Sequence, residues 1–172
     1  MIKNTMKDRK YNILYSLIVY LCLVQMVSCS SATSVLRATG LTSNSKNSLK
    51  SIALESLANS NFDTPVAVDI VFIHNGNITP ILSALSGPEW FNKKQELMKR
   101  YDNQIDLISL EVVPLSLVES MVLPKKHKQA MNIIMFTNYQ SSNGQYMAEI
   151  GHFKQLKIRL LRDSYQLVEQ GG

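Results

Sequence analysis

The sequence predicts a mainly β protein, a mostly antiparallel β-sandwich into which one amphipathic helix is inserted. Roughly six or seven short apolar or alternating segments occur within about 120 residues, a density of strands that is typical of a sandwich. Clusters of Asn, Asp, Ser, Gly and Pro separate these segments. Only one stretch changes to the helical period, so we expect one helix to cover an edge or an end of the sheets.

The first strands are expected on either side of a polar turn. Residues 49–57 alternate around Ile52 and Leu54 and could form a strand or a short helix. The turn-forming stretch that follows ends at Pro65, and residues 66–75 are the strongest strand of the chain, apolar on both faces. Asp69 interrupts the second face, and because a buried carboxylate needs partners we expect it to point outward on an exposed patch.

Residues 88–101 form the predicted helix. Ser86 and Glu89 have the spacing of a capping box, and Pro88 falls in the first turn, where its missing N–H is harmless. Trp90 and Phe91 at the start of the helix could serve as anchors for a partner protein. An aromatic pair in this position more often belongs to the core, which is the role we expect.

Strands return after the helix. Residues 105–113 alternate and end at Pro114, residues 130–139 are rich in β-formers, and residues 141–144 indicate a hairpin turn into residues 145–150. The last strands are expected at residues 155–161 and 164–170. The basic stretch Pro124–Lys128 lies between apolar runs, so we interpret it as a solvated turn.

The amino-terminal residues have the pattern of a secretory signal. A basic start precedes the apolar run Ile13–Val24, which at about 12 to 15 residues is too short to span a bilayer comfortably. Residues Met26–Cys29 resemble a bacterial lipobox, with Met26 in place of the usual Leu. Cleavage before Cys29 and its acylation would give a lasting membrane attachment, since one acyl chain alone binds weakly. Two alternatives remain: an ordinary signal cut near Ala32 that discards Cys29, and an uncleaved anchor.

We therefore predict three parts: a signal peptide over residues 1–28, a lipidated flexible tether over residues 29–48 and one β-sandwich domain over residues 49–172. Cys22 lies in the signal and acylation would consume Cys29, so the domain has no cysteine for a disulfide. Residues 1–28 also carry much of the positive charge. The rest has 14 Lys and Arg against 12 Asp and Glu, a net +2, which does not indicate nucleic-acid binding.

The motifs of catalysis and metal binding are missing from the sequence. It has no Gly-x-Ser-x-Gly, His-x-x-x-His or Cys-x-x-Cys motif, and its seven glycines form no phosphate-binding loop. Asp102 and Asp106 are close together but flank a predicted turn, where turn chemistry is their expected role. We expect no enzyme activity, no cofactor, no metal and no small-molecule substrate. We expect a tethered β domain of this kind to bind another protein.

The order of elements resembles that of the outer-membrane lipoproteins of type VI secretion systems, the TssJ-like (VasD/SciN) family. The resemblance rests on the signal and lipobox, on the passage "LANSNFDTPVAVDIVFI" into the second strand, and on "LISLEVVPLSLVES", "KHKQAMNIIMFTNYQ" and "FKQLKIRLLRDSYQL". Leu115 stands where the family has the Gly of a Pro-Gly turn. Ser30, which follows the lipidated cysteine, is not the Asp that retains such lipoproteins in the inner membrane, so the outer membrane is implied.

The resemblance implies a transthyretin-like sandwich, lipid-anchored at the periplasmic face of the outer membrane, that binds the periplasmic part of a large TssM-like inner-membrane component. The contact would use the loop Ala58–Thr64, with Asn59, Asn61, Phe62 and Asp63 as candidates. Phe62, the apolar side chain among these four, could insert into the partner or pack on its own domain. The alternatives are a pilotin-like or other envelope-assembly lipoprotein and, less expected, a periplasmic ligand-binding or enzymatic lipoprotein.

Overall fold

The computed structural model describes residues 47–171. The predicted signal peptide, Cys29 and all of the tether except Asn47 and Ser48 lie outside the described residues.

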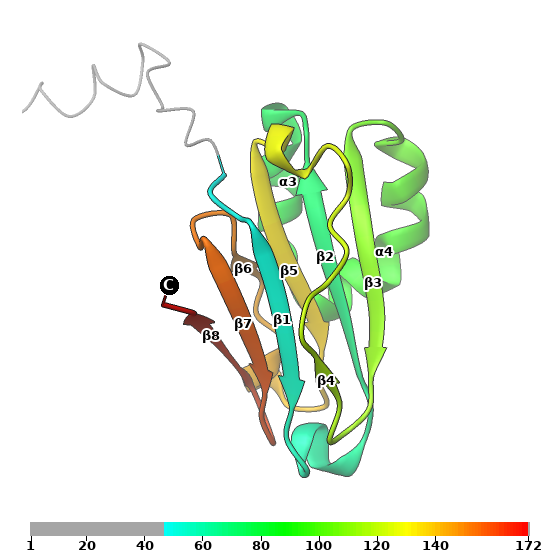
Figure 1. Cartoon of the computed structure of the whole chain (residues 1–172). Coiled ribbons are helices and arrows are strands. Elements are labelled where there is room, and N and C mark those ends of the chain that lie inside the picture. The colour runs from blue at the N-terminus through cyan, green and yellow to red at the C-terminus, as the bar shows by residue number, and fades with distance from the viewer. Residues whose placement is uncertain (1–46, 172) are drawn as a thin grey trace, which may run out of the picture. The chain divides into compact units, whose positions relative to one another are not determined.

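Two four-stranded sheets pack face to face, which confirms the predicted mainly β sandwich (Figure 1). In the first sheet the strand order is β4-β1-β7-β8, and in the second it is β3-β2-β5-β6. The strands are β1 (Ser51–Ser56), β2 (Val66–Ile73), β3 (Ile105–Val112), β4 (Leu117–Val118), β5 (Asn132–Asn138), β6 (Ala148–Glu149), β7 (Gln155–Leu160) and β8 (Tyr165–Glu169).

The pairing is antiparallel except between two central strands of the first sheet. β1 runs parallel to β7, with Ser51 opposite Gln155 and Ser56 opposite Leu160. Every other pairing, including those of β2 with β3 and β5, is antiparallel. The parallel pair joins strands about a hundred residues apart, because all four strands of the second sheet and the edge strand β4 lie between them in the sequence.

The main core fills the space between the sheets. It consists of side chains from one face of β1 and β7 and from the face of β2 and β5 opposite them. Along each strand, every second side chain points into this core. The buried members include Ile52, Leu54, Val68, Ile70, Phe72, Ile133, Met135, Leu156, Ile158 and Leu160.

A second core lies on the outer face of the second sheet, where helix α4 (Gly87–Arg100) covers β2 and β5. Trp90 is fully buried and stacks on Phe136 with their ring centroids 4.9 Å apart. This confirms the expected core role of Trp90 and explains why β2 is apolar on both faces. The capping box is present, since the carboxylate of Glu89 accepts from the Ser86 N–H at 2.8 Å.

The expectation for Asp69 was wrong. The side chain lies between β2 and α4 and the residue is only 1% exposed. Its carboxylate accepts hydrogen bonds from the Trp90 indole N–H at 2.7 Å and from the Ser109 hydroxyl, and it pairs with the Lys94 ammonium at 2.8 Å. These donors provide the partners that a buried carboxylate requires.

Smaller elements were not predicted. A short helix α3 (Thr79–Ser83) precedes α4, and the two-residue strand β4 follows the turn after β3. The predicted hairpin turn at residues 141–144 contains a 3₁₀ turn, Ser142–Gly144, and leads into a long connection, because β6 pairs only at Ala148 and Glu149. The basic stretch at residues 124–128 forms a turn, as expected, that runs into the 3₁₀ turn His127–Gln129.

Candidate functional site

The loop between β1 and β2 has an unusual backbone. Within the 3₁₀ segment η2 (Ser60–Asp63), Asn61, Phe62 and Asp63 have positive φ angles of 46°, 56° and 65°. A left-handed conformation is uncommon for residues other than glycine, and it is least expected for a bulky side chain such as that of Phe62. Such strain persists only where the surroundings hold it, and it gathers at functional sites.

The side chain of Asn61 fixes the loop to the rest of the domain through hydrogen bonds. The residue is 2% exposed, and its Nδ2 donates to Thr64 Oγ1 and to the Pro65 carbonyl, both at 2.8 Å. Its Oδ1 accepts from the Gln140 N–H at 2.8 Å, which ties the loop to the end of β5. The side chain of Asn61 therefore makes its hydrogen bonds within its own domain. The predicted contact with a partner is left to Asn59, Phe62 and Asp63.

Asn59, Phe62 and Asp63 are the predicted residues of this loop that face solvent. The left-handed backbone turns Phe62 outward, so that the residue is 41% exposed. Its ring also lies against its own domain, since the Arg162 guanidinium sits 5.2 Å from the ring centroid. Phe62 is thus partly packed on its own domain, and its exposed ring lies beside a cation.

The turn from β3 to β4 adds an apolar surface that the sequence analysis missed. Leu115 follows Pro114 with a φ of 63° and is 77% exposed. Val113 and Leu117 on either side are more than half exposed as well. Positive φ at the residue after proline is the geometry of a type II turn, in which glycine is favoured at this position. In the sequence, the one sign of this surface is Leu115 in place of the glycine that the resemblance leads us to expect.

The two loops lie at the same end of the sandwich, and the chain enters at the opposite end (Figure 1). The Ser56 N–H donates to the Ser116 carbonyl at 2.8 Å, which fixes the β3–β4 turn beside the end of β1. We call residues 58–64 together with 113–117 the loop end. The six residues of β1 separate it from the entry point by about 20 Å, at roughly 3.3 Å per residue.

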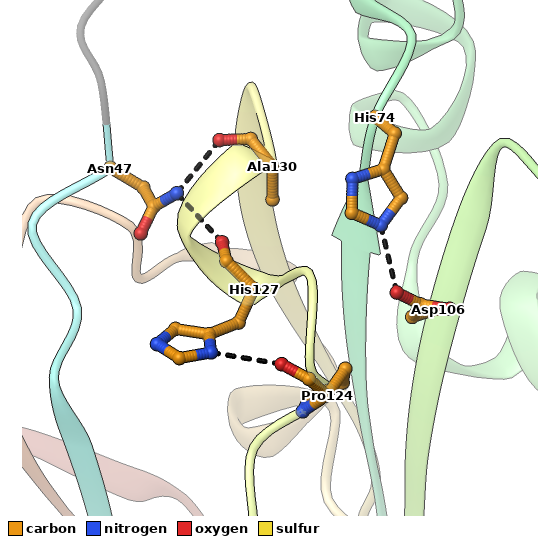
Figure 2. Close-up of polar contacts among 6 residues, drawn as sticks. All are labelled: Asn47, His74, Asp106, Pro124, His127 and Ala130. Carbon is orange, nitrogen blue, oxygen red and sulfur yellow. Dashed lines mark hydrogen bonds and ion pairs between the residues drawn. The ribbon is translucent and has the colours of Figure 1, made fainter.

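The entry point is held by Asn47 (Figure 2). Its Nδ2 donates to the His127 carbonyl at 2.9 Å and to the Ala130 carbonyl at 2.8 Å. The Ser48 N–H donates to the Gly151 carbonyl at 2.7 Å. These hydrogen bonds fix the position of Asn47, so the chain enters the domain beside the turn at residues 127–130. We call this the tether end.

The ionisable side chains do not form a catalytic arrangement within the described part of the chain. Asp106 pairs with His74 at 2.8 Å at the strand ends (Figure 2), while Asp102 is exposed on the turn. The Nδ1–H of His127 donates to the Pro124 carbonyl at 2.8 Å. Burial raises the pKa of the Tyr139 phenol well above its usual value, and the hydroxyl donates to the Leu161 carbonyl. Among residues 47–171, no group of three or more His, Cys, Asp or Glu could hold a metal ion.

No helix within residues 47–171 has the length and apolar character needed to cross a bilayer. No protein-family model matches the chain, and no curated protein matches it either.

Solved structures of similar fold include proteins of type VI secretion systems. The fold is similar to that of the lipoprotein TssJ1 from Pseudomonas aeruginosa, with a TM-score of 0.55, 12% identity, and coverage of 72% of this chain and 96% of that one. It is also similar to Lip from Serratia marcescens, a membrane-bound component of the type VI secretion system, with a TM-score of 0.52, 10% identity, and coverage of 71% and 96%.

A chain from a type VI membrane complex matches with a TM-score of 0.52 and 12% identity, over 69% of this chain and 95% of that one. At these identities the likeness concerns the fold. It confirms, at that level, the resemblance to the TssJ-like lipoproteins that was found in the sequence, including the transthyretin-like sandwich.

Proposed function

We propose that this chain is a lipoprotein of a type VI secretion system, anchored through Cys29 at the periplasmic face of the outer membrane. It holds the periplasmic part of a large TssM-like inner-membrane component through its loop end. In this role it binds protein and lipid and catalyses no reaction.

The observation that carries the proposal is the arrangement of the two ends. The chain enters the sandwich at Asn47, and the strained loop with Phe62 lies at the other end. A lipid anchor upstream of Asn47 would attach the domain at the end opposite the loop end, which stays free for a partner. A protein that joins two membranes needs this separation between its attachment and its binding surface.

The loop is suited to binding because it is already ordered. Asn61 and Thr64 fix its backbone through hydrogen bonds of 2.6 to 2.8 Å. A partner therefore need not bear the full entropy cost of ordering the loop. Phe62, Leu115 and Leu117 expose apolar surface at this end, and Arg162 lies beside Phe62. Buried aromatic and arginine side chains supply most of the energy in many interfaces.

The test is the affinity of the purified chain for the periplasmic part of the TssM-like protein encoded with it. We expect Phe62→Ala to weaken binding about 30-fold or more, which corresponds to a hot-spot loss of roughly 2 kcal/mol. Ile81→Ala is the matched control, because Ile81 is similarly exposed, at 49%, but lies in α3 at the tether end.

Two results would contradict the proposal. One is an affinity that neither substitution changes, or that both change equally. The other is binding of the chain to a secretin ring with no binding to the inner-membrane component, which would favour a pilotin-like role.

A further inference from the structure

A basic hollow lies at the tether end. It has a volume of about 630 Å³ and is open to solvent. Its walls contain three lysines and a histidine but no carboxylate; the lining residues are Asn47, Ser48, Leu49, Lys50, His127, Lys128 and Lys154.

The backbone brings these lysines together from three segments of the chain. The Lys50 N–H donates to the Lys154 carbonyl at 2.8 Å, so these two residues are neighbours across the start of β1 and β7. Lys128 comes from the turn that Asn47 holds (Figure 2). This convergence depends on the fold, since the three positions are far apart in the sequence.

Within residues 47–171, no ion pair neutralises the lysines of the hollow. Among the described residues, the ion pairs within 4.0 Å involve other side chains, and all three lysines are exposed. The carboxylate of Glu169, at the end of the neighbouring strand β8, accepts from the Lys154 and Gln155 N–H groups at 3.0 to 3.1 Å. Glu149 lines a second, smaller hollow, which shares only Asn47 and Ser48 with the basic one. Three ammonium groups around one opening form a site for an anion.

We propose that this hollow binds the phosphate groups of anionic lipid headgroups. The choice of a lipid rests on the proposed function, because the acylated tether would leave the domain at the rim of the hollow. If the 19 residues from Cys29 to Asn47 behave as a flexible linker, they would span roughly 25 Å, which would let the tether end reach the leaflet. Contact there would orient the domain with its loop end facing the periplasm.

The test uses the full chain with Cys29→Ser, so that no acyl group contributes, and flotation with vesicles of neutral phosphatidylcholine or of the same lipid with phosphatidylglycerol. Each lysine near an anionic surface strengthens binding roughly fivefold at low salt. We therefore expect Lys50→Gln, Lys128→Gln and Lys154→Gln together to lower binding to the anionic vesicles at least tenfold, and to leave the weaker binding to neutral vesicles unchanged.

The control removes the same charge elsewhere, through Lys93→Gln, Lys99→Gln and Arg100→Gln on the exposed side of α4. An equal loss in the control would overturn the site, because a general charge effect would then explain the binding. Equal binding to both kinds of vesicle would overturn it as well. A further arm adds inorganic phosphate alone: binding of phosphate at the three lysines without any preference for anionic vesicles would overturn the assignment to a lipid.

This test is separate from the test of the proposed function. Phe62→Ala in the same background is expected to keep its preference for anionic vesicles, since Phe62 lies at the loop end. Loss of the inner-membrane partner with lipid binding intact would refute the proposed function alone, and the reverse would refute the lipid site alone.

Discussion

Asp69 fastens α4 to the second sheet, and its replacement by alanine is expected to destabilise the domain strongly. Three side chains converge on this buried carboxylate: the Trp90 indole at 2.7 Å, the Lys94 ammonium at 2.8 Å and the Ser109 hydroxyl. Alanine removes the acceptor for all of them. The Trp90 N–H is then left buried without a partner.

The size of the effect follows from burial. Removing one member of a buried ion pair costs about 3 to 5 kcal/mol, and an orphaned buried donor costs about 1 to 3 kcal/mol. The side chain of Lys94 is 28% exposed and can be hydrated again, so we expect a total near the low end of the ion-pair range, about 3 to 4 kcal/mol. This is a large part of the roughly 5 to 15 kcal/mol that stabilises an ordinary domain.

Urea unfolding followed by tryptophan fluorescence measures this loss, because Trp90 is the only tryptophan of the chain and lies in the affected core. The control is Asp106→Ala, which removes a carboxylate that is 41% exposed and paired with His74, and we expect it to cost less than about 1 kcal/mol. Equal effects of the two substitutions, or a loss below about 1 kcal/mol for Asp69→Ala, would refute the structural role given to Asp69.

Two further substitutions test local features. The Ser86 N–H and hydroxyl hold the pKa of Glu89 below its usual value of 4.5, so its contribution to stability is complete above pH 4.5 and is lost as the pH falls through the lower folded value. Between about pH 6 and about pH 3, the melting temperature of the wild type should therefore fall more than that of Glu89→Gln. Parallel curves of melting temperature against pH would contradict this. Leu115→Gly should be more stable than Leu115→Ala by about 0.5 to 1 kcal/mol in urea unfolding, because only glycine relieves a φ of 63°. Equal stability would indicate that the turn is not strained.

The elements that could be predicted from the sequence are those with a strong local pattern. The strand at residues 66–75 and the helix at residues 88–101 were predicted to within two residues at each end. Their apolar periods and the capping box at Ser86 and Glu89 are read within a few neighbouring residues. The parallel pairing of β1 with β7 has no local signature, because it depends on how the two sheets are connected.

The error at Asp69 has the same cause. Its partners Trp90, Lys94 and Ser109 lie 21, 25 and 40 residues further along the chain. A carboxylate within an apolar strand looks unpaired until the helix is placed over it. The indole N–H and the ammonium then come within reach, and burial becomes favourable.

The candidate site was only partly visible in the sequence. The composition of residues 58–64 predicted a turn, but the opposite directions of Asn61 and Phe62 follow from three left-handed residues in succession. Asn and Asp favour this conformation, whereas the aromatic Phe62 does not indicate it. The exposed apolar residues of the β3–β4 turn alternate as in a strand, and this pattern does not indicate that they lie on the surface. The basic hollow was equally hidden, because its lysines come from distant segments.

One measurement tests most directly whether the chain joins a lipid leaflet to an inner-membrane partner. The TssM-like protein is tagged in its native host, isolated from envelopes in mild detergent, and the intact mass of the co-purifying chain is determined. We predict a chain that begins at Cys29 and carries the added mass of three acyl chains. Absence of the chain from the complex, or an unmodified amino terminus at another residue, would contradict the proposal.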